Sequence, residues 1–432
     1  MKTKYQTYLD STVVLVSALM FLFVVSSQSL PSGTFYVLCV LSLMVWGANR
    51  KTMPFEPGVY ASQYKTLFIL CSINLLAVLV SKIAHQHLSG SEIEKAARFS
   101  VGLPLLMLGM RYIPVEKLKH CLWGVYAAVL YAFGFIFYLS WPDFARPDTS
   151  DVYNAVGYGV IALLLSTIAF YSIGVPLTSK PRLEKTAKII IGLLGMAGFM
   201  LTQTRTGLLV LPVYLLLGIL LAWKDSSRIK IVIGYVASLA VIAVLLFSMP
   251  VVQNRVELAK NEFLHCIQVD PIANTSICMR LQLWNSAIDI WKRNPLTGMA
   301  SNAQFNEELQ KYAVPKGIAS QHVADDFGEP HNDYLQALSS FGLLGVLGLL
   351  FLYFAPAWIF VKRLVQSNQL AIRSFAAMGA AVCLGFAMYG MTELMFRGMR
   401  TLSFYTFMVT VFLLLSANLK DNQLPGKLVS GK

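Results

Sequence analysis

The chain has 432 residues, of which 56% are hydrophobic and only 13% charged, and its mean hydropathy is +0.60. Soluble globular domains carry about 25% charged residues, so the composition excludes an ordinary soluble fold. The apolar residues form long runs, and a helix needs about 17–25 residues to cross a bilayer. A transmembrane β-barrel would instead alternate in polarity over strands of about ten residues. The sequence therefore predicts an all-α polytopic membrane protein.

Twelve segments are apolar enough to be predicted as transmembrane helices. They are residues 11–27, 33–48, 66–82, 98–112, 119–140, 154–174, 187–202, 206–223, 229–249, 333–361, 371–391 and 402–417. The first one follows Lys2 and Lys4 and resembles a signal peptide. No small-residue cleavage site comes after it, so we expect an uncleaved first span.

The formal net charge of +13 has two interpretations. Nucleic-acid binding is one, and the enrichment of Lys and Arg in cytoplasmic loops is the other. With the N-terminus inside, basic residues collect in the predicted inner segments, and the short outer loops are poor in them. We therefore expect both termini in the cytoplasm and no nucleic-acid partner.

The one long connection, residues 250–332, falls on the outer side. Within it Arg280, Trp284, Ala287 and Trp291 lie on one helical face. This helix should end at Asn294-Pro295, and residues 297–328, with Gly298, Pro315, Gly317 and Gly328, are expected to be a loop.

These features divide the chain into three parts. Residues 1–249 hold the first nine predicted helices, residues 250–332 form a partly helical periplasmic loop region, and residues 333–432 hold the last three helices and a cytoplasmic tail.

Six cysteines are present, and four of them lie in or beside predicted spans. Cys266 and Cys278 are the pair in the long outer loop, where the compartment is oxidising. A disulfide between them is one hypothesis, and two free thiols are the other. No sequence motif for a metal site or a phosphate-binding loop occurs.

Charges near hydrocarbon are costly, so two arginines on the outer side are candidates for function. Arg205 lies in a tight turn, Thr202–Gly207, between two predicted spans. It either reaches the headgroups as an ordinary interfacial arginine or lies buried and hydrogen-bonded. Arg280 is either a surface charge or a residue of the tryptophan face.

His331 follows Pro330 at the start of the tenth predicted span. Histidine titrates near neutral pH and can accept a proton from a hydroxyl group. The acids expected to orient the imidazole are Asp325, Asp326, Glu329 and Asp333. A structural histidine at a helix start is the alternative.

The predicted topology places His331, Arg205 and Arg280 at the same membrane surface. Guanidinium groups bind phosphate oxygens through paired hydrogen bonds, and two of them can stabilise a diphosphate leaving group without a metal. Together with a general base, they indicate glycosyl transfer from a lipid diphosphate to an acceptor alcohol.

At these residues the sequence resembles the O-antigen ligase family. His331-Asn332 is followed by nine residues and then Gly342-Leu343-Leu344-Gly345, which is similar to the family's histidine signature. The turn at 202–205 and the segment Met279-Arg280-Leu281 are similar to two further family segments. We expect Gly342 and Gly345 to let a neighbouring helix approach closely.

The resemblance implies a GT-C-like membrane fold and transfer of O-antigen polysaccharide from undecaprenyl diphosphate to lipid A–core oligosaccharide, without metal or other cofactor. It implies His331 as the base and Arg205 and Arg280 as diphosphate ligands. The enzyme would lie in a Gram-negative inner membrane with its site facing the periplasm.

The last outer turn, residues 393–400, is similar to an acid-plus-arginine segment of the family. Its candidates for a supporting role are Glu393, Arg397 and Arg400. Glu393 and Arg397 are four residues apart, so an ion pair within one helix is the alternative.

Three other functions remain open from the sequence. O-antigen polymerases and protein O-oligosaccharyltransferases share the superfamily and the donor chemistry. A polytopic lipid or glycan transporter is a more distant alternative, because internal repeats and charges near the membrane midplane are not evident in the sequence.

Overall fold

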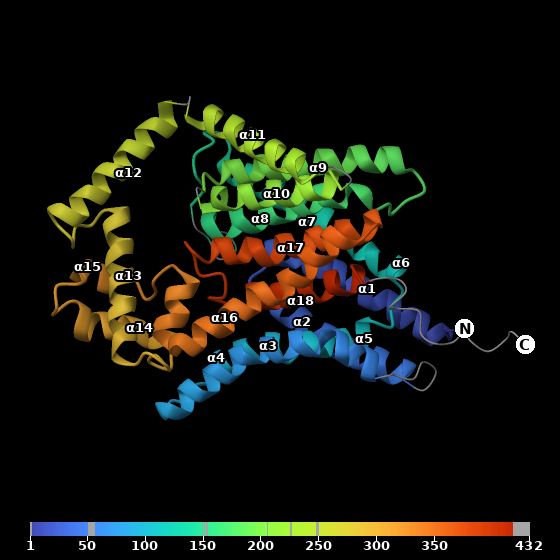
Figure 1. Cartoon of the computed structure of the whole chain (residues 1–432), viewed down its shortest axis with the longest axis horizontal. Helices are drawn as coiled ribbons and strands as arrows, with labels where there is room; N and C mark the ends of the chain where they lie inside the picture. The colour runs from blue at the N-terminus through green and yellow to red at the C-terminus, as the bar shows by residue number, and fades with distance from the viewer. Residues whose placement is uncertain are drawn as a thin grey trace, which may run out of the picture.

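Figure 1 shows the computed structural model, an elongated bundle of helices with a smaller helical part at one end. The structure describes residues 2–50, 57–148, 150, 152, 154–204, 206–224, 227–247 and 250–417. Within these ranges all regular secondary structure is helical. The prediction of an all-helical protein is confirmed.

The helices of the bundle fall into two groups along the chain. The first group is α1 (Lys4–Ser26), α2 (Leu30–Asn49), α3 (Pro57–Ala84), α4 (Gly90–Ser100), α5 (Gly102–Met110), α6 (Val115–Leu118), η1 (Lys119–Cys121), α7 (Leu122–Ser140), α8 (Ala155–Tyr171), η2 (Ser172–Gly174), α9 (Pro181–Leu201), η3 (Thr206–Val210), α10 (Leu211–Ala222) and α11 (Arg228–Phe247). The second is α16 (Asp333–Gln366), α17 (Leu370–Tyr389) and α18 (Met399–Leu415).

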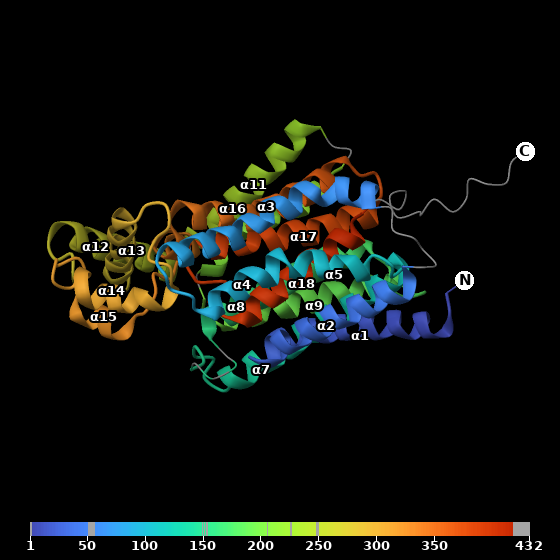
Figure 2. The same cartoon turned by 90° about the horizontal axis from the view of Figure 1, so that it is seen from below.

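Between α11 and α16 lie α12 (Pro250–Gln268), α13 (Ser276–Arg293), η4 (Asn302–Gln304), α14 (Phe305–Glu308), η5 (Leu309–Ala313) and α15 (Gln321–Asp326). These elements gather at one end of the molecule, and α1 begins at the opposite end (Figures 1 and 2).

Seven of the described helical stretches are long and apolar enough to cross a membrane. They are Lys4–Ser26, Leu30–Asn49, Tyr64–Ala84, Val115–Ser140, Ala155–Gly174, Asp333–Gln366 and Leu370–Tyr389. Shorter apolar helices are Thr206–Ala222, Ile229–Ala240 and Met399–Leu415. The protein is therefore a polytopic membrane protein.

Two of the twelve predicted spans differ from this set for local reasons. The predicted fourth span is divided into α4 and α5, which meet at Val101. The predicted seventh span corresponds to α9, whose first turns carry four charged residues, Arg182, Glu184, Lys185 and Lys188. A helix with that many charges is less apolar than its central residues indicate.

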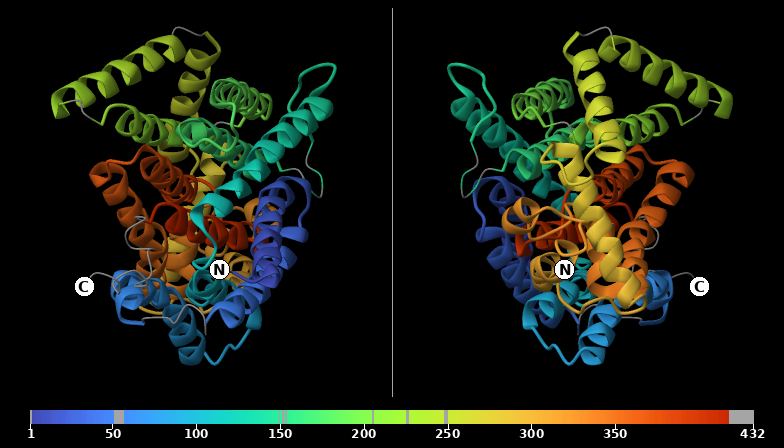
Figure 3. Two further views of the ribbon diagram at one scale, coloured as in Figure 1. Left: turned by 90° about the vertical axis from the view of Figure 1, so that its right-hand side faces the viewer. Right: turned by 90° about the vertical axis from the view of Figure 1, so that its left-hand side faces the viewer.

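The centre of the bundle is formed by α17 and α18, which are buried along most of their length. α16 packs against both α3 and α17, and α8 packs against α9. Figure 3 views the molecule from its two ends and shows α11, in yellow-green, projecting from the remaining helices.

The part between α11 and α16 has a small hydrophobic core of its own. It includes Leu283, Ile290, Phe305, Leu309 and Val323. α13 confirms the predicted helix around 280–291; it ends at Arg293, and Asn294 is its C-cap residue. The expectation of a loop at 297–328 is wrong in part, because α14, η5 and α15 lie within it and bury one or two apolar side chains each.

A disulfide joins α12 to α13. It links Cys266 and Cys278, whose Cα atoms are 5.5 Å apart. Apart from Cys266, the described side chains of α12 are largely exposed. The covalent link is therefore the main attachment of the end of α12 to the core around α13.

The backbone of α16 departs from helical geometry at Gly342, where φ is +65°. A Cβ atom at this position would lie 2.3 Å from the carbonyl carbon of Leu296. The expectation that a helix approaches Gly342 and Gly345 is wrong, since Gly342 faces a loop and Gly345 faces its own helix. The close helix contact is at Gly348, against Asn74 of α3.

Residues 295–300 dock onto this break in α16 through backbone hydrogen bonds. The bonds run from Leu343 N to Pro295 O (2.9 Å), from Leu344 N to Leu296 O (3.4 Å), from Met299 N to Ser339 O (3.0 Å) and from Ala300 N to Ser340 O (2.8 Å). They supply partners for backbone groups that the broken helix leaves without one.

A buried ion pair attaches the same segment to α3 and α4. Lys82 Nζ lies 3.0 Å from Glu92 Oε2 and donates to Ala300 O at 3.1 Å. Glu92 also accepts from Ser301 Oγ (3.1 Å) and Asn302 N (3.2 Å). Burial alone would raise the pKa of Glu92, but hydrogen bonds from Ser89, Lys82 and Ser301, together with the charge of Lys82, lower it to about 2.

We predict that Gly342→Ala destabilises the protein by about 1–3 kcal/mol, the range for a residue forced into a disfavoured backbone region. Gly47→Ala is the matched control, because a Cβ at this helical position of α2 meets nothing within 4 Å. Thermal unfolding in detergent measures both variants. Equal melting temperatures for the two would contradict the role given to Gly342.

Candidate functional site

His331 lies at the junction between the small helical part and α16. Its φ is +46°, a left-handed conformation that is rare outside glycine. Such strain costs about 1–3 kcal/mol and persists only where the surrounding structure holds it. Asn332 then caps α16, since its side chain accepts from Tyr334 N (3.0 Å) and Leu335 N (3.1 Å).

Hydrogen bonds from two other segments hold this junction. Trp284 Nε1 donates to Pro330 O (3.1 Å), Asn332 Nδ2 donates to Met391 O (2.8 Å), and Asp333 N donates to Gly390 O (2.7 Å). α13 and the turn at 390–398 therefore fix the position of His331.

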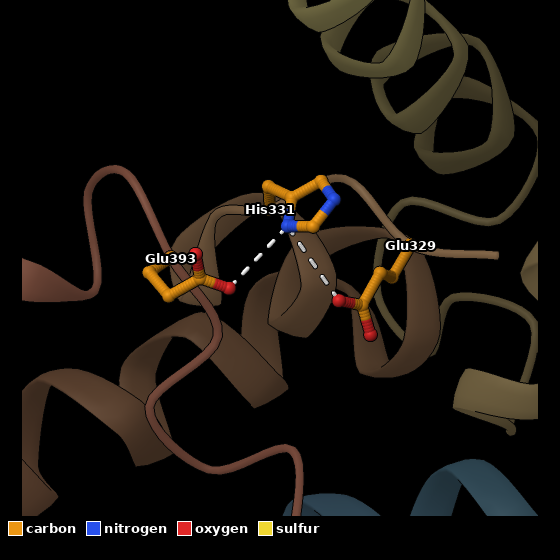
Figure 4. A group of neighbouring side chains, drawn as sticks. All are labelled: Glu329, His331 and Glu393. Carbon is orange, nitrogen blue, oxygen red and sulfur yellow. Dashed lines mark hydrogen bonds and ion pairs between the residues drawn. The ribbon is translucent and has the colours of Figure 1, made fainter. Parts of the chain in front are cut away.

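The imidazole of His331 faces two carboxylates through one of its nitrogens (Figure 4). Nδ1 lies 3.3 Å from Glu393 Oε1 and 3.6 Å from Glu329 Oε1, and all three side chains are largely buried. Carboxylates facing Nδ1 favour a proton on that nitrogen. Nε2, which points away from both acids, is then left with a free lone pair.

Arg397 pairs with Glu329. Its Nε donates to Glu329 Oε2 at 2.8 Å, and a second contact joins Nη2 to Oε1. The alternative of a Glu393–Arg397 pair within one helix is wrong, because residues 390–398 form turns. Arg400, on α18, donates to Val152 O at 3.5 Å.

Asp333 is buried and does not contact the imidazole. Its Oδ2 accepts from Tyr353 Oη (2.6 Å) and Met395 N (3.2 Å). Tyr353 also stacks on Phe396, with ring centroids 5.4 Å apart. Asp333 thus holds the turn that carries Glu393 in place.

Two of the four acids expected near the imidazole lie elsewhere. Asp325 accepts hydrogen bonds from Gln310 and Gln321, and Asp326 pairs with His322 at 3.0 Å. Only Glu329 among the four contacts His331. Glu393 was not among them, since it lies 62 residues away in the chain, and only the family resemblance pointed to its segment.

Arg205 lies outside the described residues. The preceding turn is well anchored: Thr204 Oγ1 donates to Ala155 O at 2.8 Å, and Thr202 Oγ1 donates to Phe199 O at 2.7 Å.

Arg280 is partly buried on α13 and makes no hydrogen bond or ion pair within the described part of the chain. The structure gives no contact between Arg280 and His331. Trp284, one turn further along the same face, donates to Pro330 O. Arg280 therefore lies on the face of α13 that meets the histidine junction.

A pocket of about 260 Å³ opens beside this site, between α3, α4, α16 and the turn at 390–398. Its polar lining includes Glu92, Lys95, Asn302, Glu329, Asp333, Gln336 and Arg397. Its apolar lining includes Val78, Phe341, Leu349, Leu352 and Leu402. Glu329 is common to the pocket and to the contacts of His331.

Glu329, His331 and Glu393 also form a group that could hold a metal ion, since their ligand atoms lie within 4.8 Å of one another. The sequence shows no metal motif because the group is assembled from two distant segments. The contact of Arg397 with Glu329 competes with a metal for the same carboxylate.

The chain is similar to known proteins over the region of the site. Residues 190–350 match a family model described as O-antigen ligase. An uncharacterized protein of Haemophilus influenzae is 23% identical over 374 residues, which cover 84% of this chain and 88% of the relative. A protein of Escherichia coli K12 named O-antigen ligase is 27% identical over 165 residues, which cover 38% of each protein.

The matched region contains Arg205, Arg280 and His331, whereas Glu393 and Arg397 lie beyond it. The resemblance to the O-antigen ligase family is confirmed. The match supports a function of the O-antigen ligase or polymerase type, and members of that family are glycosyltransferase-like enzymes.

Proposed function

We propose that this protein is an O-antigen ligase. It transfers O-antigen polysaccharide from undecaprenyl diphosphate to a hydroxyl of lipid A–core oligosaccharide, at the periplasmic face of a Gram-negative inner membrane. The observation that carries the proposal is the geometry of His331, whose Nδ1 faces two carboxylates and whose Nε2 points away from them.

In the proposed step, Nε2 of His331 takes the proton from the acceptor hydroxyl. The resulting oxygen attacks the anomeric carbon of the donor, the bond from that carbon to the diphosphate oxygen breaks, and undecaprenyl diphosphate leaves. Glu393 orients the ring and stabilises the imidazolium through Nδ1. A single displacement inverts the configuration at the anomeric carbon.

Arg205 and Arg280 are the proposed ligands of the diphosphate. Charge on the leaving oxygens grows during bond breaking, and arginine pairs with phosphate oxygens in two parallel hydrogen bonds. Arg280 has no competing carboxylate among the described residues, so its guanidinium is available to a ligand. The proposed step uses no metal, nucleotide or other cofactor.

We further propose a GT-C-like fold with twelve transmembrane helices and both termini in the cytoplasm. The domains would be residues 1–249, 250–332 and 333–432. The elements α12–α15, which precede His331 in the chain, lie at the end of the bundle opposite the start of α1 (Figure 1), and this arrangement supports the proposed orientation.

A polymerase or a protein O-oligosaccharyltransferase would use the same base and the same donor chemistry with a different acceptor. A transporter would not need a histidine held between carboxylates at one end of the bundle. The nature of the product therefore decides between these functions.

We predict that His331→Ala abolishes attachment of O-antigen to lipopolysaccharide, since general base catalysis contributes about 10²–10⁴-fold in rate. Complementation of a deletion strain, followed by gel analysis of lipopolysaccharide and of the lipid-linked pool, measures the effect. Long chains should accumulate on the carrier lipid. His322→Ala, at an exposed position paired with Asp326, is the matched control.

Full-length O-antigen on lipopolysaccharide in the His331→Ala strain would refute the assignment of His331 as the general base. Accumulation of single repeat units on the carrier would identify a polymerase.

We predict that Glu393→Gln lowers the transfer rate by about tenfold, the effect of losing one charge-assisted hydrogen bond. The glutamine keeps the size of the side chain but not the charge that stabilises the imidazolium. Turnover of the purified variant at saturating donor measures the change, and Glu393→Asp should recover part of it. An unchanged rate in Glu393→Gln would remove Glu393 from the proposed step.

We predict that Arg280→Ala abolishes transfer, whereas Arg280→Lys retains weak activity because lysine keeps the charge and loses the paired hydrogen bonds. Lys292→Ala, an exposed cation on the same helix, should behave as wild type. Donor concentration dependence separates a binding defect from a chemical one. Normal transfer in Arg280→Ala would contradict diphosphate binding.

A further inference from the structure

The pocket beside the site contains a cation that the proposed transfer does not use. Lys95, on α4, is partly buried and lines the pocket. Its Nζ donates to Arg397 O at 2.7 Å, and it forms no ion pair with any residue that the structure describes. Burial, the largest effect, lowers the pKa of Lys95. A bound anion would offset this cost.

The other charged residues of the pocket wall already have partners. Glu92 pairs with Lys82 at 3.0 Å, and Arg397 pairs with Glu329. Asp333 accepts hydrogen bonds from Tyr353 and Met395. Among the charged side chains of the pocket wall, Lys95 is therefore the one with a single backbone carbonyl as its partner and no ion pair among the described residues.

The remaining lining is divided between amides and hydrocarbon. Asn302 and Gln336 lie among the polar residues, and Phe341, Leu349 and Leu352 provide apolar surface. A volume of about 260 Å³ is below the range of about 300–1,000 Å³ for pockets that enclose drug-sized ligands. It suits a small polar group together with the first carbons of a chain.

We infer that this pocket binds the phosphate-bearing headgroup of an anionic lipid. Lys95 contacts the phosphate, the Arg397 guanidinium lies on the same wall, and the apolar residues contact the adjoining carbons. Phosphate carried by a lipid has two sources in this setting, the substrates of transfer and the bulk anionic phospholipids, and the chemistry of recognition is the same for both.

This pocket is distinct from the position proposed for the reacting groups. Glu329 lines the pocket, whereas His331 is not among the lining residues. Arg397 contacts Glu329, and Glu329 lies 3.6 Å from His331 Nδ1. A phosphate that binds the Arg397 guanidinium would therefore be connected to the histidine through the Glu329 carboxylate.

The test measures lipid binding without any transfer reaction, so its outcome is independent of the proposed function. Native mass spectrometry of the purified full-length protein is carried out with phosphatidylglycerol, with undecaprenyl diphosphate and with lipid A–core. We expect Lys95→Gln to weaken binding of at least one of these lipids by about tenfold, the effect of one charge-assisted hydrogen bond. Lys95→Arg should bind as wild type does.

Two further variants make the result specific. Lys292→Gln removes an exposed positive charge from α13 and should leave binding unchanged. Ala337→Leu narrows the pocket while keeping Lys95 and should weaken the same lipid that Lys95→Gln affects, which tests the pocket even if Lys95→Gln does not fold.

The affected lipid identifies the source. A loss confined to undecaprenyl diphosphate or to lipid A–core assigns the pocket to that substrate, and a loss for phosphatidylglycerol assigns it to bulk lipid. Unchanged binding of all three lipids in Lys95→Gln or in Ala337→Leu would overturn the inference, as would equal losses in Lys95→Gln and Lys292→Gln.

Discussion

The docking of residues 295–300 onto the broken turn of α16 is the constraint on which the site depends. A helix that leaves regular geometry at the edge of a membrane exposes backbone groups that lipid cannot satisfy. Four backbone hydrogen bonds between this segment and α16, two donated by each, satisfy these groups around Gly342. The same docking fixes the end of α13, and through Trp284 and Pro330 it fixes the backbone of His331.

His331 and Asp333, two residues apart, have different roles in the site: Asp333 holds a neighbouring turn in place, and His331 carries the proposed reactive nitrogen. Asp333 is turned into the protein, where it holds the turn at 390–398 through Tyr353 and Met395. The same turn carries Glu393, whose carboxylate lies beside Nδ1 of the His331 imidazole. A strained histidine backbone is thereby paired with an acid from a distant segment, an arrangement that leaves one ring nitrogen free for proton transfer.

Hydropathy predicted most of the bundle because a membrane imposes long apolar helices, and helical periodicity predicted α13 from its tryptophans. The break at Gly342 could not be predicted, since a glycine within an apolar run has the same pattern whether it is helical or left-handed. The spacing of four residues between Glu393 and Arg397 predicts an ion pair only if the segment is a helix. The actual partner of Arg397, Glu329, lies 68 residues away, and local spacing carries no information about such contacts.

Transfer by the purified protein is the most direct test of whether His331 is the general base of a metal-independent glycosyl transfer. The protein in detergent is mixed with undecaprenyl diphosphate-linked O-antigen and lipid A–core, in the presence of EDTA and without ATP. We expect a glycan–lipid product from the wild type and none from His331→Ala, with both proteins binding the donor equally. Product formation by His331→Ala at the wild-type rate, or a wild-type reaction that proceeds only with ATP or a divalent metal, would contradict this expectation.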